Sequence, residues 1–136
     1  MKKNDLVYIC SPLSAPTKEG MWQNMENAEH YARLVSEIFG CRAIAPHSFL
    51  PEYLDDHIPE EREAGLAFGL SVLKLSKAII VCGSRISSGM RGEIRLAGEL
   101  DIPAYALIEY EGRIALAEIT QEERTDEMQV CKRNIP

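Results

Sequence analysis

The sequence predicts an α/β fold, a Rossmann- or flavodoxin-like three-layer sandwich with a mostly parallel sheet of four to five strands. Three observations support this prediction. The short apolar runs are continuous rather than alternating, which is typical of strands covered on both faces. Helical segments separate these runs, and such alternation implies right-handed crossovers between parallel strands. Glycine and proline stand at the expected element boundaries.

The first half of the chain contains two expected strands and the first long helix. Leu6–Cys10 is a continuous apolar run that predicts a buried strand. Lys18–Phe39 predicts a helix, because its apolar residues recur at helical spacing and form a stripe of Met21, Met25, Ala28, Ala32, Val35 and Phe39. Gly40 is expected to end this helix as its C-cap. Residues 42–46 predict the second strand, and a loop at 47–51 follows.

The second half of the chain continues the alternation. Pro59–Leu75 predicts a helix, because proline suits a first turn and the glutamates that follow it complement the helix dipole. The other expected elements are strands at 78–83 and 102–108, a third helix between the loop 84–89 and residues 100–101, and a short helix opened by a capping box at 120–123.

Length and composition predict one domain over residues 1–136, with a core at about 6–108 and a C-terminal tail at 109–136. The formal net charge is -6 without a lysine or arginine cluster, which argues against binding to nucleic acid polymers or anionic membranes. No apolar stretch has the length of a membrane helix and no signal-peptide region is present, so we expect a cytoplasmic protein. None of the four cysteines forms a C-x-x-C pair. We expect neither a metal nor a cofactor, since no motif for either is present.

The fold class also predicts where a ligand binds. Parallel α/β sheets bind ligands at the carboxyl ends of their strands, in the loops that lead into helices. In this chain those loops begin at Ser11, His47 and Ser84. We therefore expect the ligand site near these three positions.

Glu93 is the most informative residue of the third helix. It falls within the apolar arc formed by Met90, Ile94, Leu96, Ala97 and Leu100, whereas the polar face lies opposite. A carboxylate that faces a sheet near the start of a helix is unfavourable unless it is paired or functional. We expect Glu93 to point toward the carboxyl ends of the strands and to have a functional role in the ligand site there. A structural pairing with a buried arginine or hydroxyl is the alternative.

For the other candidate site residues, a structural role such as helix capping or core packing is an alternative to ligand binding. Ser87, Ser88 and Gly89 precede the third helix, where serine caps a helix and glycine lets backbone N–H groups approach a ligand. Tyr8 is either a core tyrosine or part of the site. His47, at a strand end, either packs locally or contacts a ligand.

Two aspartates stand before the second helix. Of Asp55 and Asp56, one is expected to cap that helix while the other faces the pocket.

Several segments of the chain, from about Leu6 to Ala106, resemble the nucleoside 2-deoxyribosyltransferase-like superfamily, and within it a branch of short phage and bacterial proteins. The resemblance is most specific at the Gly-Met-x-x-Glu start of the third helix, which contains Glu93. The other matching residues are 7–12 (Val-Tyr-Ile-Cys-Ser-Pro), Asn24, Ala28, Ala32, 45–47 (Ala-Pro-His), 54–56 (Leu-Asp-Asp), 61–62, 82–83 and 86–90.

This resemblance implies a chemistry and a set of roles. The glutamate matching Glu93 attacks the anomeric carbon of the sugar and displaces the base, as in retaining glycosidases. The tyrosine matching Tyr8 orients that glutamate, and Asp56 is the candidate acid or base. The implied substrate-binding residues are Ser11, Pro12, His47, Asp55, Ser87, Ser88, Gly89 and Met90. The chain departs from the family in one respect, because the resemblance places Lys77 where the familiar enzymes have a catalytic aspartate.

Two functions follow as expectations. The first is a nucleoside or nucleotide N-glycosidase or 2-deoxyribosyltransferase that uses a covalent Glu93 intermediate. The alternative is a non-catalytic binder of a nucleotide or nucleotide-derived signal in the same pocket, which Lys77 and the altered first loop favour. The resemblance also implies a homodimer or larger homo-oligomer.

Overall fold

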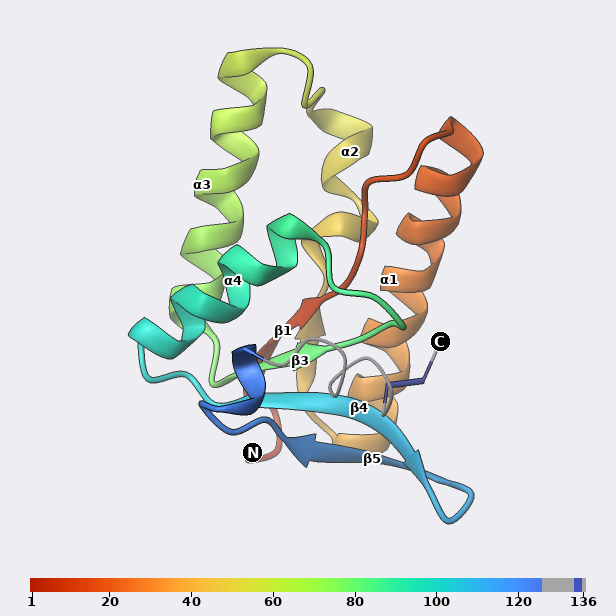
Figure 1. The fold of residues 1–136 in the computed structure, drawn as a ribbon, viewed down its shortest axis with the longest axis vertical. Coiled ribbons are helices and arrows are strands. Elements are labelled where there is room, and N and C mark those ends of the chain that lie inside the picture. Colours follow the sequence, from red (N-terminus) through yellow and green to blue (C-terminus); the bar gives the residue numbers. More distant parts are fainter. Residues whose placement is uncertain (126–133, 136) are drawn as a thin grey trace.

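The computed structural model describes residues 1–125 and 134–135. Within them a five-stranded sheet forms in the order β2-β1-β3-β4-β5 (Figure 1). The strands are β1 (Leu6–Cys10), β2 (Arg42–Ile44), β3 (Ala78–Val81), β4 (Ala104–Tyr110) and β5 (Arg113–Glu118). The first four strands are parallel, and β5 pairs antiparallel with β4. The predicted mostly parallel sheet is confirmed.

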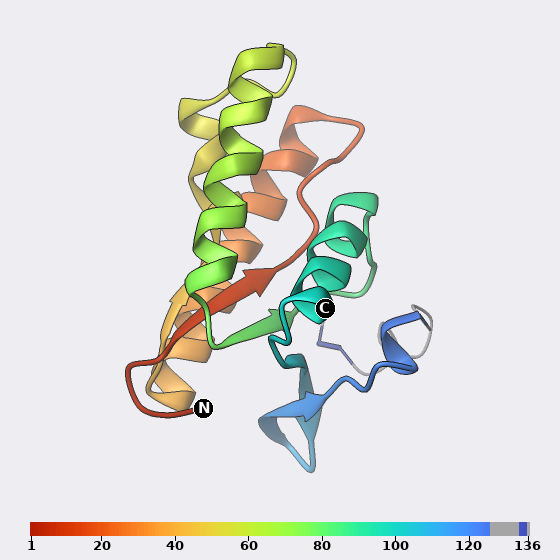
Figure 2. The same ribbon diagram turned by 90° about the vertical axis from the view of Figure 1, so that its left-hand side faces the viewer.

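The helices cover both faces of this sheet. They are α1 (Lys18–Phe39), α2 (Leu50–Tyr53), α3 (Pro59–Leu75) and α4 (Ser88–Glu99), with 3-10 turns η1 (Pro46–Ser48) and η2 (Glu123–Thr125). The helix α1 lies on one face of the sheet and the helices α3 and α4 lie on the other (Figure 2). Their buried side chains pack against these two faces. The predicted bounds of α1 and α3 are confirmed, whereas η1 and α2 form where a loop was expected. Among the described residues, no helix combines the length and the apolar character needed to cross a membrane.

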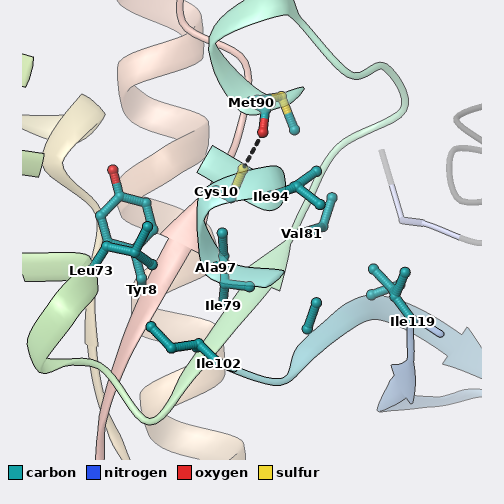
Figure 3. Close-up of a cluster of buried hydrophobic side chains, with 12 residues drawn as sticks. Tyr8, Cys10, Leu73, Ile79, Val81, Met90, Ile94, Ala97, Ile102 and Ile119 are labelled. Carbon is teal, nitrogen blue, oxygen red and sulfur yellow. Dashed lines mark hydrogen bonds between the residues drawn. The ribbon is translucent and has the colours of Figure 1, made fainter. Parts of the chain in front are cut away.

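Side chains of β1 alternate between two apolar clusters. Val7 and Ile9 pack with α1, whereas Tyr8 and Cys10 pack with α3 and α4. Figure 3 shows the second cluster, in which the Cys10 thiol donates to the Met90 carbonyl at 4.0 Å. The strand β3 is completely buried between the two layers. The continuous apolar runs thus correspond to strands covered on both faces, as predicted.

Local capping residues set several element ends. Gly40 has φ 70° and its N–H donates to the Ser36 carbonyl at 3.0 Å, which is the expected left-handed C-cap of α1. The capping box at 120–123 also forms, since Glu123 N donates to Thr120 Oγ1 at 3.2 Å and Thr120 N to Glu123 Oε1 at 3.3 Å. It opens the single 3-10 turn η2.

A fifth strand lies beyond the core expected at 6–108. The turn between β4 and β5 has positive φ at Glu111 (51°) and Gly112 (75°), the geometry of a tight hairpin turn. The end of the chain then returns to the sheet. Asn134 bridges to Ile108, and its side-chain amide donates to the Gly83 carbonyl at 2.9 Å. Cys131 lies outside the described residues.

The strand order reverses between β1 and β3, and this reversal defines a crevice. The connection after β1 leads to α1 on one face, and the connection after β3 leads to α4 on the other. Gly83 has φ +95°, and a β-carbon there would lie 3.1 Å from Pro12 Cδ. The two loops therefore meet closely at the topological switch point, where open α/β sheets bind ligands.

Candidate active site

Glu93 lies within the first two turns of α4 and faces the sheet between the buried residues Met90, Ile94 and Ala97. Its Oε2 atom is buried and has no hydrogen-bond partner. Burial raises the pKa of Glu93, while the charge of His47 and a hydrogen bond with Tyr8 act in the opposite direction. A buried carboxylate oxygen without a partner is uncommon in folded proteins, which makes Glu93 a candidate for a catalytic or ligand-binding group.

Tyr8 reaches Glu93 from the neighbouring strand. Its side chain is only 3% exposed, and burial together with the Glu93 charge raises the pKa of Tyr8 well above its usual range. The phenol therefore stays protonated and donates its hydrogen bond to the carboxylate. In Figure 3 the hydroxyl points toward the same end of the sheet as the β1 arrowhead. Tyr8 is thus a core residue whose polar end faces the candidate site.

His47 approaches the same carboxylate from the end of β2. It belongs to the turn η1, and its Nδ1 lies 3.0 Å from the carbonyl oxygen of Ser11. The charge of a protonated His47 lowers the pKa of Glu93, so the two groups are near neighbours. The side chain is partly buried rather than free in solvent.

Ser11 and Pro12 form the start of the loop after β1. Ser11 is 1% exposed, and its hydroxyl oxygen is buried without a partner. Pro12 packs against Gly83 across the switch point. The Ser11 hydroxyl is therefore a second unsatisfied polar group at the carboxyl ends of the strands.

Ser87 is the N-cap of α4. Its hydroxyl accepts from Met90 N at 3.3 Å, while Ser87 N donates to Met90 Sδ at 3.4 Å. Ser88 and Gly89 are exposed in the first turn of the helix. Met90 is fully buried, so its side chain belongs to the core and to the cap. The Ser87 hydroxyl hydrogen is not used by these cap contacts and is available to a ligand.

The two aspartates lie on the exposed turn before α3. Asp55 Oδ1 accepts from His57 N at 2.8 Å within the turn before α3, and both Asp55 and Asp56 are exposed. The N-cap of α3 is Ile58, without a side-chain cap, so the expected aspartate cap is absent. Neither aspartate is among the groups that shift the pKa of Glu93. Tyr8 and His47 both contribute to that pKa, whereas the role of Asp56 as acid or base stays a prediction.

The position of Lys77 corrects an inference from the family resemblance. Lys77 is exposed and precedes β3, and its N–H donates to the Leu6 carbonyl at 2.8 Å, at the start of β1. It therefore lies at the amino ends of the strands, whereas Glu93 lies near their carboxyl ends. Lys77 does not occupy the position of an acid or base for this site.

Gly69 is a site residue that the sequence analysis did not identify. A β-carbon at this position of α3 would lie 3.3 Å from the Tyr8 hydroxyl. A glycine inside a helix is unfavourable by about 1 kcal/mol relative to alanine, so its presence there indicates a packing or functional reason. In this structure Gly69 leaves room for the hydroxyl that contacts Glu93.

Comparison with solved structures supports the fold class. One similar structure is a 2-deoxyribosyltransferase from the psychrotolerant bacterium Bacillus psychrosaccharolyticus, with a TM-score of 0.58, 16% identity, and coverage of 74% of this chain and 70% of that one. Another is a conserved protein from Enterococcus faecalis V583, with a TM-score of 0.54, 16% identity, and coverage of 79% and 65%. The chain thus has an α/β fold distantly like that of 2-deoxyribosyltransferases.

Sequence comparison identifies the family. Residues 5–107 match the model of a domain of unknown function, DUF7768. The chain therefore belongs to the DUF7768 family. No curated protein matches it.

Proposed function

We propose that this protein breaks the N-glycosidic bond of a nucleoside or nucleotide through a covalent ester between the sugar and Glu93. The observation that carries the proposal is the buried, unpartnered Glu93 carboxylate oxygen beside Tyr8 and His47. The likeness in fold to a 2-deoxyribosyltransferase agrees with it. In this mechanism Glu93 attacks C1′, the base leaves with the electron pair of the glycosidic bond, and water or a second base then releases the sugar.

Each neighbour of Glu93 has a task in this reaction. The Tyr8 phenol holds one carboxylate oxygen by hydrogen bonding and leaves the other free to attack. The charge of His47 opposes the effect of burial on the pKa of Glu93, although burial remains the larger effect. A dry environment also strengthens the attraction between the carboxylate and the positive charge that develops on the sugar.

A pocket of about 240 Å³ supports a phosphorylated substrate. It lies between α1 and the loops after β1 and β3, and its lining includes Asn24, Asn27, Tyr31 and Arg85. Arg85 donates through Nη2 to the Ser14 carbonyl at 2.7 Å, and its other N–H groups are available to an anion. We propose that a 5′-phosphate binds here while the sugar extends across the strand ends to Glu93. In Arg85→Gln, KM for a 5′-monophosphate should rise at least about tenfold, with no such rise for the nucleoside.

The decisive experiment measures release of free base from a panel of 2′-deoxynucleosides and their 5′-monophosphates. We expect release by the natural protein and loss of it in Glu93→Gln. The matched control is Glu99→Gln, because Glu99 lies exposed on the outer side of the same helix. A 2′-fluorinated substrate, which slows breakdown of the ester, should leave a sugar adduct on the peptide that contains Glu93. Base release that survives in Glu93→Gln would exclude the covalent mechanism.

The alternative is a nucleotide-binding protein without catalysis. The exposed position of Asp55 and Asp56 on the turn before α3 favours this function, because the family resemblance assigns the acid to a carboxyl group. Calorimetry on the same ligand panel distinguishes the two functions. Saturable binding of a nucleotide without any release of base would support the binder and contradict the glycosidase.

We also propose that the protein forms a homodimer through α3. Only Leu73 of this helix is buried, whereas Leu66 is 65% and Leu75 70% exposed. The first turn of α3 is acidic and its last turn contains Lys74. Antiparallel packing of α3 against α3 of a second copy would cover Leu66 and place opposite charges across the interface.

A further inference from the structure

We propose that His47 is the acid that protonates the leaving base and then the base that activates water. This inference rests on the proposed function and assigns a step that the mechanism above leaves without a group. A nucleobase leaves slowly as an anion, so a proton donor is needed on the base side of the glycosidic bond. Among the residues around Glu93, His47 is a titratable side chain positioned for this task.

The contact with Ser11 determines which ring nitrogen is free. A carbonyl oxygen only accepts hydrogen bonds, so the Nδ1 atom 3.0 Å from it carries a hydrogen. The exchangeable proton of His47 is then the one on Nε2. The same bond anchors the ring to the strand that carries Tyr8, because Ser11 directly follows β1. His47 thus has a fixed orientation and one nitrogen available for proton transfer.

The proposed reaction has two steps. In the first step Glu93 bonds to C1′, the C1′–N bond breaks, and the Nε2–H of the imidazolium passes to the departing base. In the second step the neutral Nε2 takes a proton from water, whose oxygen bonds to C1′ and displaces the Glu93 carboxylate. The products are free base and free sugar, and both residues return to their starting states.

An electrostatic contact links His47 to Glu93. The Glu93 carboxylate lies close enough for the two charges to attract each other. Formation of the sugar ester removes the negative charge of Glu93 and with it this attraction. The roles of nucleophile and acid are in this way coupled by one electrostatic contact.

The test uses a variant that retains the anchoring hydrogen bond. In His47→Asn, the side-chain amide nitrogen can replace Nδ1 as donor to the Ser11 carbonyl, but no group replaces Nε2. For ordinary purine nucleosides or nucleotides we expect the single-turnover rate of base release, which does not include hydrolysis of the ester, to fall about 10²- to 10⁴-fold. For N7-methylated purine substrates, whose base leaves without a proton, we expect this rate to fall less than about threefold. The control His57→Asn changes an exposed histidine before α3.

The outcomes separate this inference from the proposed function. An equal loss on both substrate types, or no loss on either, would overturn the acid role of His47 while leaving Glu93 as nucleophile. Full activity of Glu93→Gln on the methylated substrate would instead overturn the proposed function. If the natural protein releases no base even from the methylated substrate, both proposals are wrong. Retention of the natural melting temperature in His47→Asn excludes unfolding as the cause of a loss.

Discussion

The Tyr8 hydroxyl packs against Gly69 of α3. A β-carbon added at Gly69 would lie 3.3 Å from the hydroxyl oxygen. In Gly69→Ala, the gain in helix propensity of about 1 kcal/mol is offset by crowding of a ring that is 97% buried. We therefore expect a change of less than about 1 kcal/mol in unfolding free energy, but a clear fall in base release as the hydroxyl moves relative to Glu93. Denaturant unfolding and the release assay measure the two effects.

Gly92→Ala provides the matched control. Gly92 lies in α4 one residue from Glu93, and a β-carbon there would meet nothing within 4 Å. We expect it to raise the unfolding free energy by about 0.5–1 kcal/mol and to leave activity unchanged. Equal activity of the two alanine variants would show that Tyr8 has no positioning role.

Glu93→Gln should become more stable than the natural protein as the pH rises. Burial raises the pKa of Glu93 above the ordinary value of 4.5 for a glutamate. A carboxyl group of this kind contributes its full stability below its unfolded pKa and loses that contribution as the pH rises through the folded pKa. Glutamine has no such dependence. The difference in unfolding free energy should therefore grow in favour of the variant above about pH 4.5, as measured by urea unfolding at several pH values.

Glu93→Ala separates a functional carboxylate from a structural partner. If Glu93 serves the reaction, alanine removes a desolvated charge and lowers the unfolding free energy little or not at all, while activity is lost. A loss of about 1–3 kcal/mol, with activity declining only as the fold weakens, would instead indicate a structural pairing.

Gly83→Ala should strongly destabilise the switch point. The backbone has φ +95° there, a conformation that L side chains rarely adopt, and the new β-carbon would also lie 3.1 Å from Pro12 Cδ. We expect a loss of about 1–3 kcal/mol in thermal unfolding. Gly112→Ala shares the positive φ (75°) but meets no neighbour, so its smaller loss would isolate the contribution of the Pro12 contact.

Leu66→Glu should disrupt the proposed dimer. The leucine is 65% exposed in the monomer, so glutamate should change monomer stability by less than about 0.5 kcal/mol, but it would place a charge in the α3 interface. Light scattering at tens of micromolar, a range that suits interfaces near micromolar affinity, should then report a monomer. Trp22→Glu, an equivalent change on α1, should remain dimeric. A monomeric natural protein would exclude the proposal.

Local patterns were sufficient to predict most elements. The bounds of α1 and α3 follow from helical spacing and from end residues such as Gly40 and Pro59, which act through contacts within a few residues. The predicted sheet of four to five strands is confirmed, but the position of the fifth was not predicted, because β5 is half-buried and alanine-rich and lacks a long apolar run. Its hairpin turn at Glu111 and Gly112 was the available signal.

The sequence by itself determined that Glu93 faces the sheet, because the period of the helix places it among buried side chains. Only the tertiary structure decided which residues surround it. Ser11 and His47 are separated by 36 positions yet lie 3.0 Å apart, since β1 and β2 are parallel neighbours. The same strand arrangement puts Lys77 at the opposite end of the sheet and leaves Asp56 on an exposed turn. Strand order and loop path depend on packing across the whole domain, and no local pattern encodes them.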